Sequence, residues 1–517
     1  MKREIFISAT PQETRVAILE DDVLVEVRVE RADAERIVGD IYLGHVQAVL
    51  PGIQAAFVEI GTEKAGFLHV SDVLLDDDDE DENGNGNDNG DGDGGGGRRR
   101  SRRYPPIQDL IAKGDSTLVQ VTKEPISTKG PRVTRQVSLP GRFVVYMPYS
   151  THVGVSRKIE GREERSRLRA LAKEILPKDS GGVIIRTVGE ELTRDAFERE
   201  LNTLISAWKK IEKRATSSKA PAVVHREAKL VRGVIRDVFS DKVDRIVVDQ
   251  ADLYSEIRQY LHGMDPGLLD RVQYDAEPEP LFDRHGIEDA IQVAFERRVD
   301  LKSGGYLVIE PTEALVSIDV NTGRFTGKRD PDKTILRTNL DAAREVARQL
   351  RLRDMGGIIV VDFIDMEVKG HQDQVMQELR TWLGRDRART KAFHISELGL
   401  VQMTRQRVRP SLYQAMTERC THCGGAGRVF TPETVLRRVE RALKRVALGG
   451  AEKSMTVRVH PEVALYALEE EHDFVRRLQG AHRLEFMLRD DPLLRQDEYR
   501  LLAGSAGTDV TKRYAER

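Results

Sequence analysis

The chain has 517 residues, of which 39% are hydrophobic and 32% are charged. At roughly 100–200 residues per domain, this length corresponds to about three to five domains. No run approaches ~18 consecutive apolar residues, and the N-terminus lacks the apolar segment of a signal peptide, so neither a membrane span nor secretion is expected. The two cysteines are too few for a disulfide scaffold and favour the reducing cytoplasm.

Charge is distributed unevenly along the chain. The net charge is −3, but residues 76–93 form an acidic run rich in glycine and asparagine, and the remainder is basic. Arginine clusters recur, such as RLRLRD from Arg348 and TRQRVRPS from Thr404. A basic body is typical of nucleic-acid-binding proteins. Residues 75–103, with an acidic half followed by an arginine-rich half, are predicted to be a disordered loop.

Short strands are predicted in the N-terminal part of the chain. Apolar residues alternate over 4–7, 15–19 and 23–29, with a turn at Asp21-Asp22. From 39 to 121 the pattern is one of short strands punctuated by glycine, which predicts a small barrel interrupted by the loop described above.

Helices and strands alternate beyond the barrel. Apolar spacing predicts helices over 160–176 and 190–215, and a strand at 244–249 followed by another helix. A small α/β segment is predicted from about 433 to 501. The strongest α/β pattern lies between Gly304 and Met366, and it carries the candidate catalytic residues.

Two apolar strands in that region end in aspartate. The segment EALVSIDVNTG ends its apolar run at Asp319 and has Asn321 two residues later, and a second apolar strand, 358–361, ends at Asp362. Helical spacing over 339–353 lies between them, which is long enough for a crossover between parallel strands. If the strands are parallel neighbours, both aspartates emerge at the carboxyl edge of the sheet, where open α/β sheets bind ligands.

Paired carboxylates at this edge indicate a metal site. They repel each other unless a cation lies between them, and hard oxygen ligands favour Mg²⁺ or Mn²⁺. Asn321 would project to the same side as Asp319, where it could orient a scissile phosphate or a water molecule. The alternative is that each aspartate only ends its strand and caps the next element. Asp365, in the same turn as Asp362, is a weaker candidate with a local role.

Three long blocks resemble the catalytic core of the ribonuclease E/G family: EALVSIDVNTG, NLDAAREVARQLRLRDMGGIIVVDFIDM and TRQRVRPSL. The resemblance extends from the first residues to about Leu501. It implies that Asp319 and Asp362 hold one Mg²⁺ and that Asn321 assists catalysis. The implied activity is endonucleolytic hydrolysis of single-stranded RNA, stimulated by a 5′-monophosphate, in ribosomal and transfer RNA processing and messenger RNA decay. A non-catalytic RNA-binding scaffold is the rival hypothesis, but it would not need the paired acids.

The resemblance also implies a fold and its boundaries. The chain is expected to be a multidomain protein of α/β and β type. Its expected parts are a ribonuclease H-like region in two pieces (1–37 and 231–294), an S1-type OB-fold barrel between them (38–135, with the insert 75–103), a 5′-phosphate sensor region (136–230), a deoxyribonuclease I-like catalytic domain (295–416), a zinc-link (417–431) and a small α/β dimerisation domain (432–517).

The barrel carries candidate RNA-binding residues. Aromatic rings beside basic residues are the usual platform on which single-stranded bases stack. Phe57 and Phe67 are such rings, although both could instead fill the barrel interior. The family resemblance implies that Phe57, Phe67 and Lys123 contact RNA.

The segments LPGRFVVYMP and GGVIIRTVG resemble the family's sensor of a 5′-terminal monophosphate. Such a group is bound well by a guanidinium, a hydroxyl and backbone N–H groups. The resemblance assigns these roles to Arg186 and Thr187, with Gly141 and Val145 lining the pocket and Arg389 as a further arginine. Without the resemblance, both arginines would be read as ordinary surface residues.

Cys420 and Cys423 form a C-x₂-C knuckle with His422 between them. Structural zinc takes four ligands, and the chain has no other cysteine. Either His422 and another histidine complete the site, or two chains each contribute both cysteines. The resemblance implies the second arrangement, a zinc-link that makes a homodimer, with a homotetramer left open. A redox pair or inert thiols are the alternatives, but no thioredoxin-like strand-to-helix placement surrounds Arg419 in the sequence.

Overall fold

The computed structural model describes most of the chain: residues 1–31, 36–74, 104–125, 130–156, 159, 161–178, 180–190, 192–239, 242–323, 331–396 and 398–515. The loop predicted over 75–103 lies outside these residues. The chain divides into two compact units, Met1–Ala415 and Met416–Arg517. None of the helices in the described ranges is both long and apolar enough to cross a lipid bilayer.

The first sheet joins two parts of the sequence that are far apart. Its five strands lie in the order β3-β2-β1-β14-β15. They are β1 (Arg3–Ala9), β2 (Glu13–Glu20), β3 (Val23–Arg31), β14 (Arg245–Val248) and β15 (Val272–Tyr274). The first three confirm the predicted short strands and pair antiparallel, and β14 and β15 join parallel to β1. The barrel is therefore inserted between strands of one sheet. Helices α4 (Leu230–Val238) and α5 (Ala251–Met264) supply apolar side chains to the core of this first sheet.

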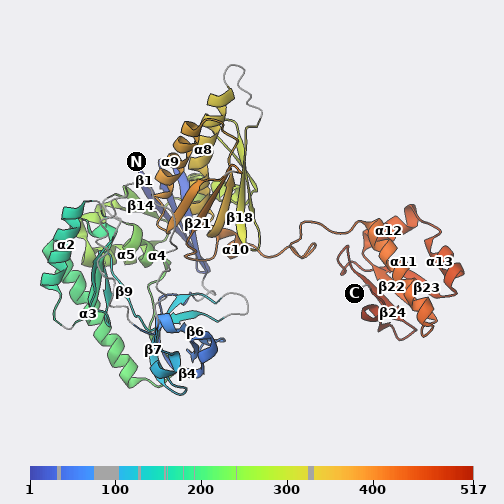
Figure 1. Ribbon diagram of the computed structural model, residues 1–517, viewed down its shortest axis with the longest axis horizontal. Coiled ribbons are helices and arrows are strands. Elements are labelled where there is room, and N and C mark those ends of the chain that lie inside the picture. Colours follow the sequence, from blue (N-terminus) through green and yellow to red (C-terminus); the bar gives the residue numbers. More distant parts are fainter. Residues whose placement is uncertain are drawn as a thin grey trace, which may run out of the picture. The chain divides into compact units, whose positions relative to one another are not determined.

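A closed five-stranded barrel confirms the β-rich prediction for the next region. Its strands are β4 (Ile41–Leu50), β5 (Ala55–Glu59), β6 (Gly66–His69), β8 (Arg132–Thr134) and β7 (Ser116–Lys123). They pair in that order, and β7 returns to β4, which closes the barrel. Short helices η1 (Pro51–Ile53), η2 (Val70–Asp72) and α1 (Ile107–Leu110) connect them. Figure 1 shows the barrel around the labels β4, β6 and β7.

The region after the barrel is a small sheet covered by two helices. The sheet has the order β11-β12-β10-β9. Its elements are β9 (Leu139–Pro140), β10 (Val144–Met147), β11 (Val153–Val155), β12 (Gly182–Ile185), the turn η3 (Thr187–Gly189), α2 (Arg162–Ile175), α3 (Arg194–Ser217) and β13 (Ala222–His225), which pairs with the barrel strand β4. The two helices confirm those predicted over 160–176 and 190–215. Their apolar faces share one core with this sheet.

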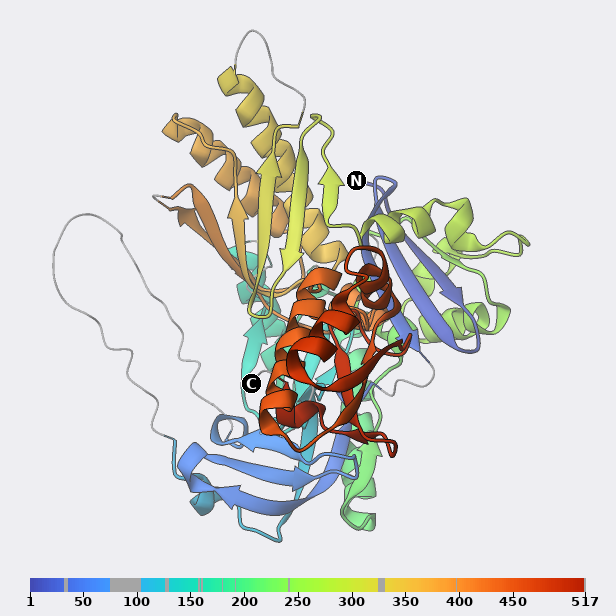
Figure 2. The ribbon, with the colours of Figure 1, turned by 90° about the vertical axis from the view of Figure 1, so that its right-hand side faces the viewer.

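A six-stranded sheet carries the two predicted strands that contain Asp319 and Asp362. The second strand ends at Asp362, whereas the first continues two residues past Asp319 to Asn321. The sheet has its strands in the order β16-β17-β18-β19-β21-β20. They are β16 (Arg298–Asp300), β17 (Tyr306–Pro311), β18 (Leu315–Asn321), β19 (Gly357–Asp362), β21 (Leu400–Arg405) and β20 (Thr390–Ile395). Helix α8 (Pro331–Leu352) connects β18 to its parallel neighbour β19, and α9 (Lys369–Leu383) follows. Both helices lie on one side of the sheet (Figures 1 and 2), where they share its apolar core. We call the other side the open face.

Shorter helices complete the first unit. Three of them pack against the first sheet: η4 (Pro266–Arg271) contacts β15, α6 (Leu281–Arg284) contacts β1 and α7 (Ile287–Val293) contacts β3. A fourth, α10 (Leu412–Met416), follows β21 in the chain. Helix α8 begins eight residues before the predicted start at 339. The prediction missed its first two turns because their side chains are mainly polar or charged and give little apolar periodicity.

The second unit is a small α/β domain, as predicted. Its sheet has the order β23-β22-β24-β25, with β22 and β23 parallel. The elements are α11 (Pro432–Gly449), β22 (Ser454–Val459), α12 (Pro461–Glu469), α13 (Phe474–His482), β23 (Glu485–Asp490), β24 (Tyr499–Ala503), β25 (Thr508–Asp509) and α14 (Thr511–Tyr514). The apolar faces of its helices and strands form a separate core.

Candidate active site and RNA-binding surfaces

The two candidate metal ligands are neighbours on adjacent strands. Parallel pairing of β18 with β19 places Asp319 directly opposite Asp362, and both carboxylates are exposed. The amide Nδ2 of Asn321 donates a hydrogen bond of 2.8 Å to Oδ2 of Asp319. The structure thus brings together the three residues that the sequence pattern singled out.

Strand alternation determines which way these side chains point. In β18 the apolar Ile318 and Val320 are buried in the core shared with the helices, so Asp319 lies on the open face. Sequence reasoning missed a supporting residue, Asn339 of α8, which is fully buried. Its amide donates to the carbonyl of Ile364 and accepts from the Ile364 N–H, at 2.8 and 3.1 Å. A buried asparagine inside a predicted apolar helix face was the available signal, because such a group needs partners.

The electrostatics of this edge favour a cation. Partial burial, the charge of Asp319 and the charge of Asp365 together raise the pKa of Asp362. Among the described residues no group of three or more histidine, cysteine or acidic side chains is arranged to hold a metal. Mg²⁺ is commonly bound through one or two carboxylates together with water and substrate phosphate. Two facing carboxylates in a repulsive environment therefore fit this ion.

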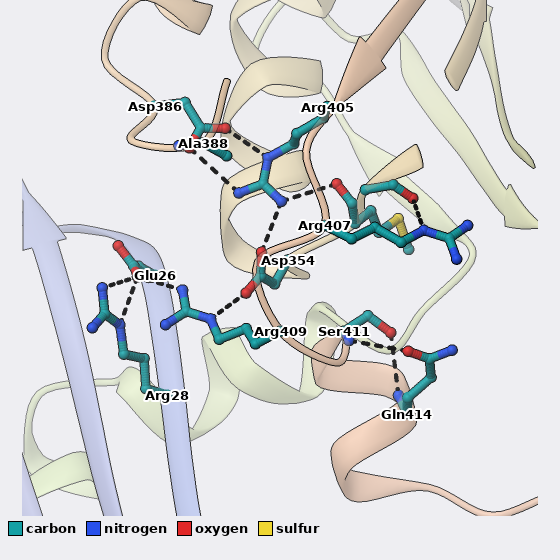
Figure 3. A network of polar contacts seen from close by, with 12 residues as sticks. Glu26, Arg28, Asp354, Asp386, Ala388, Arg405, Arg407, Arg409, Ser411 and Gln414 are labelled. Atoms are coloured by element: carbon teal, nitrogen blue, oxygen red, sulfur yellow. Dashed lines mark hydrogen bonds and ion pairs between the residues drawn. The ribbon is translucent and has the colours of Figure 1, made fainter. Parts of the chain in front are cut away.

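The arginine cluster that begins at Thr404 has a structural role (Figure 3). The buried Arg405, at the end of β21, donates to Asp386 at 2.6 Å and to Asp354 at 2.7 Å. Arg409 pairs with Asp354 and donates to Glu26 of β3 at 2.7 Å. We call these five residues the arginine network. Burial opposes ionisation of Glu26, but neighbouring guanidinium groups outweigh it and hold its pKa well below the usual range. These arginines, which the sequence placed in a basic RNA-binding body, are occupied by internal ion pairs.

A cleft of about 870 Å³ lies beside the arginine network and is lined by Glu26, Arg186 and Arg387 among others. Arg387 makes no hydrogen bond or ion pair with any residue that the structure describes, although solvent in the cleft reaches it. Burial lowers its pKa to about 10, and Glu26 opposes this effect while Arg28 adds to it. Arg387 is thus an ionised group at neutral pH with no direct partner in the described chain.

The predicted sensor residues are only partly brought together. Nη1 of Arg186 donates to the carbonyl of Gly141 at 2.7 Å and to Asp237 at 2.8 Å. Thr187 lies beside it and exchanges a hydrogen bond of 2.9 Å with Ser156. Val145 is on β10, next to β12, which leads to Arg186. Arg389 is not among the residues that line the cleft, and Arg387, two residues earlier, takes that place.

Backbone donors beside Gly141 are turned toward an internal carboxylate. Glu200 of α3 accepts hydrogen bonds from the N–H groups of Arg142, Phe143 and Val144, at 2.5, 2.9 and 3.0 Å. Burial raises the pKa of Glu200, against the opposing effect of these donors. A Cβ at Gly141 would lie 2.8 Å from this carboxylate and from the Val144 carbonyl, so only glycine fits here.

The two phenylalanines of the barrel form a surface pair. Phe57 and Phe67 are opposite each other on β5 and β6, with ring centroids 6.0 Å apart, and both are half-buried. The residues that alternate with them point into the barrel, which rules out the alternative that both rings fill its interior. Arg132 pairs in register with Phe67 and with the exposed Lys123. Arg132, which sequence reasoning missed, is held by Asp72 through two hydrogen bonds of 2.8 and 3.0 Å.

Cys420 and Cys423 lie in turns ahead of α11. The N–H of Gly427 donates to the sulfur of Cys423 at 3.3 Å, and this and further backbone donors lower the pKa of that thiol. The ring of His422 lies 6.5 Å from that of His460, yet no set of three ligands forms within the described part of the chain. Within the described residues, the knuckle therefore consists of two cysteine thiols without a third metal ligand beside them.

Comparison with known families fits this geometry. The family model described as Ribonuclease E/G family matches residues 138–408, more than half of the chain. The chain belongs to the ribonuclease E/G family. A second model, RNase E/G, Thioredoxin-like domain, matches residues 419–504. The sequence pattern did not predict a thioredoxin-like domain. In the described structure of this domain, Cys420 and Cys423 precede its first helix, α11, and the junction between β22 and α12 is occupied by His460 and Pro461. The two cysteines therefore do not lie at the strand-to-helix junction where a thioredoxin-like redox pair would lie.

Curated relatives share most of this length. Ribonuclease G of Haemophilus influenzae is 39% identical over 468 residues, which cover 90% of this chain and 92% of that protein. Ribonuclease G of Escherichia coli K12 is 36% identical over 499 residues, which cover 96% and 99%. Ribonuclease E of Nostoc sp. PCC 7120 is 42% identical over 434 residues, which cover 83% of this chain and 59% of that protein.

Proposed function

We propose that this protein is an endoribonuclease that hydrolyses phosphodiester bonds of single-stranded RNA, leaving a 5′-phosphate and a 3′-hydroxyl. The observation that carries the proposal is the pair of exposed carboxylates, Asp319 and Asp362, facing each other on the open face. Membership of the ribonuclease E/G family and relatives named ribonuclease G support RNA as the substrate. Processing of ribosomal and transfer RNA and decay of messenger RNA are the roles that the family resemblance suggests.

Asp319 and Asp362 would hold one Mg²⁺. A bound Mg²⁺ would lower the pKa of its water and neutralise charge on the phosphate. Asn321 fixes the orientation of the Asp319 carboxylate through its hydrogen bond of 2.8 Å. Asn339 fixes the turn that follows Asp362. The chain thus contributes a prepositioned pair of oxygen ligands rather than a mobile one, which matters because misplaced ligands reduce rate strongly.

The barrel surface is suited to holding the RNA strand. Phe57 and Phe67 offer two rings for base stacking, worth about 1–3 kcal/mol per base. Lys123 and Arg132 lie in register beside them, where their charges can meet backbone phosphates. Binding at this surface would tolerate many sequences, because every base has a π-face.

A separate pocket would recognise a 5′-monophosphate end. The residues that the family resemblance assigns to it are Gly141, Val145, Arg186, Thr187 and Arg389. Arg186 and Thr187 lie side by side, and the cleft next to Arg186 is rich in arginine. Because this pocket and the carboxylates are on different elements, an occupied pocket would stimulate cleavage without being required for it.

Two copies of the chain would share a structural zinc ion. Each would provide Cys420 and Cys423, which together make the four thiolates that such sites use. Backbone N–H groups already favour the thiolate of Cys423. The proposal predicts one zinc per two chains, and loss of both metal and dimer in Cys420→Ser, measured by metal analysis and light scattering. A variant that stays zinc-loaded and dimeric would contradict it.

The decisive test is cleavage of a short single-stranded RNA in Mg²⁺. Wild type, Asp362→Asn and the neighbouring Asp365→Asn would be compared on RNAs that carry a 5′-monophosphate or a 5′-hydroxyl. Cleavage that disappears only in Asp362→Asn and is faster on the monophosphate supports both the metal site and the 5′ pocket. Wild type that binds the RNA without cutting it would instead support the RNA-binding scaffold.

A further inference from the structure

The open face of the catalytic sheet carries more than the two aspartates. Strand pairing aligns one row of residues across it, and every second residue of each strand faces this way. The row consists of Arg298 on β16, Val308 on β17, Asp319 on β18 and Asp362 on β19. The next row places Tyr306 of β17 opposite Asn321 of β18. Arg298 and Tyr306 therefore share a face with the catalytic residues.

Arg298 and Tyr306 form a stacked pair. The guanidinium carbon of Arg298 lies 4.0 Å from the centre of the Tyr306 ring. Asp300, on the same strand, accepts a hydrogen bond of 2.9 Å from Nε of Arg298 and forms an ion pair of 2.8 Å with its Nη2. The Arg298 side chain is nevertheless 61% exposed. The Arg298 guanidinium thus contacts the Tyr306 ring with one face and Asp300 with one edge, and it remains accessible to a ligand.

The position of this pair matches the neighbourhood of the scissile bond. Adjacent strands are about 4.8 Å apart, so β17 lies about 5 Å and β16 about 10 Å from β18. A nucleotide bonded to a phosphate at Asp319 and Asp362 can reach that far. Guanidinium planes and aromatic rings are the groups on which unstacked RNA bases are held. Arginine suits this role better than lysine because its cation is flat and weakly hydrated.

We propose that Arg298 and Tyr306 form a subsite that binds the nucleobase next to the scissile phosphodiester of single-stranded RNA. This inference rests on the proposed ribonuclease function and extends it by naming a contact on the substrate. The competing interpretation is that the stack only stabilises the short edge strand β16. A structural role would affect folding, whereas a subsite affects one position of the RNA.

The test is a double-mutant cycle that combines a substitution in the protein with removal of one base from the RNA. A single-stranded RNA with one defined cut would be made with a single abasic nucleotide at each position around that cut. Wild type, Arg298→Ala and the neighbouring Arg297→Ala would be assayed for kcat/KM. Arg297→Ala is the matched control because it removes the same charge from an exposed side chain. Arg297 pairs with Glu310 and not with Tyr306.

In wild type and Arg297→Ala, one abasic position beside the cut should lower kcat/KM by about 5- to 150-fold, the cost of one lost base stack. In Arg298→Ala the same abasic position should cost less than about twofold, because the stack is already gone. Each comparison is made within one variant, so a partly folded preparation does not affect the ratio. Tyr306→Phe, which keeps the ring, should behave as wild type.

An abasic penalty of equal size in wild type and Arg298→Ala would overturn the subsite, and so would the absence of any sensitive position. Failure of wild type to cut the intact RNA is a different result, because it would overturn the proposed ribonuclease function itself.

Discussion

Charged residues are used in opposite ways in two regions of the sheet that carries Asp319 and Asp362. At the carboxyl ends of β18 and β19, Asp319 and Asp362 are exposed, carry like charges and repel each other. At the opposite end of β19, the residues of the arginine network are buried except Arg409, which is partly buried, and every carboxylate in the network has a guanidinium partner. Charges that fold the protein are neutralised internally, whereas charges that would bind a ligand are left for that ligand to neutralise.

Buried polar contacts hold strand β19 at both of its ends. Arg405 on β21 pairs in register with Gly357, the first residue of β19, and bonds Asp354 just before it. Five residues later the same strand ends at Asp362. The network thus fixes the start of the strand, and Asn339 fixes the turn after its end. Rigid support at both ends positions the carboxylate without neutralising it.

The largest expected effect comes from breaking the arginine network. Arg405→Met should lower the free energy of unfolding of the first unit by about 3–5 kcal/mol, because it leaves Asp354 and Asp386 buried without their main partner. Denaturant unfolding, followed by a probe in the catalytic sheet, measures this change. The control is Arg407→Ala, since Arg407 is exposed and, among the described residues, donates only to the backbone carbonyl of Gly356, and it should change stability by less than about 1 kcal/mol. Equal effects of the two substitutions would remove the distinction drawn above.

The second effect concerns activity rather than stability. Asp362→Asn should reduce kcat/KM for RNA cleavage at least about 100-fold, the scale of losing one charged group at a reacting centre. Its unfolding free energy should stay within about 0.5 kcal/mol of wild type, because the change is exposed and removes repulsion from Asp319. Parallel activity and unfolding measurements test both statements. A large loss of stability would show that the carboxylate pair has a structural role.

A third, smaller effect would separate two arginines. Arg387 lines the cleft and makes no hydrogen bond or ion pair with any described residue, whereas Arg389 does not line the cleft. Arg387→Ala should lower the preference for a 5′-monophosphate over a 5′-hydroxyl about tenfold, since a charged hydrogen bond contributes about 1.5–3 kcal/mol. Cleavage of the 5′-hydroxyl RNA should be nearly unchanged. The reverse outcome, loss of preference in Arg389→Ala alone, would favour the assignment implied by the family resemblance.

Sequence reasoning succeeded where one short segment determines the answer. The two strands that carry Asp319 and Asp362 could be predicted from an apolar run followed by an acid, and the barrel from short strands. It failed where the answer depends on distant partners. The cluster around Arg405 looked like basic surface because Asp354, Asp386 and Glu26 lie far away in the sequence. The placement of Arg387 in a cleft depends in the same way on β3.

The smallest expected effect is a shift in pH dependence at the carboxylate pair. A proton and a divalent cation compete for Asp362, and its raised pKa means that Mg²⁺ binding weakens on acidification before an ordinary aspartate would titrate. The effect of acid on folding stability at this site has the opposite sign. A raised pKa means that the ionised carboxylate is less favourable in the folded state, and protonation relieves its repulsion with Asp319. Acid should therefore weaken Mg²⁺ binding at this site without lowering the folding stability of the protein through Asp362.

Asp365→Asn sharpens this last prediction. Partial burial and Asp319 would still raise the pKa of Asp362, but the contribution of Asp365 would be gone. The pH at which Mg²⁺ affinity is half-maximal should fall by a few tenths of a unit, because exposed charge pairs contribute about 0.2–1 kcal/mol. Calorimetric titration of Mg²⁺ over a pH series measures it, with the distant, exposed Asp252→Asn as control. An unchanged midpoint in Asp365→Asn would mean that burial and Asp319 alone set the affinity of this edge for protons.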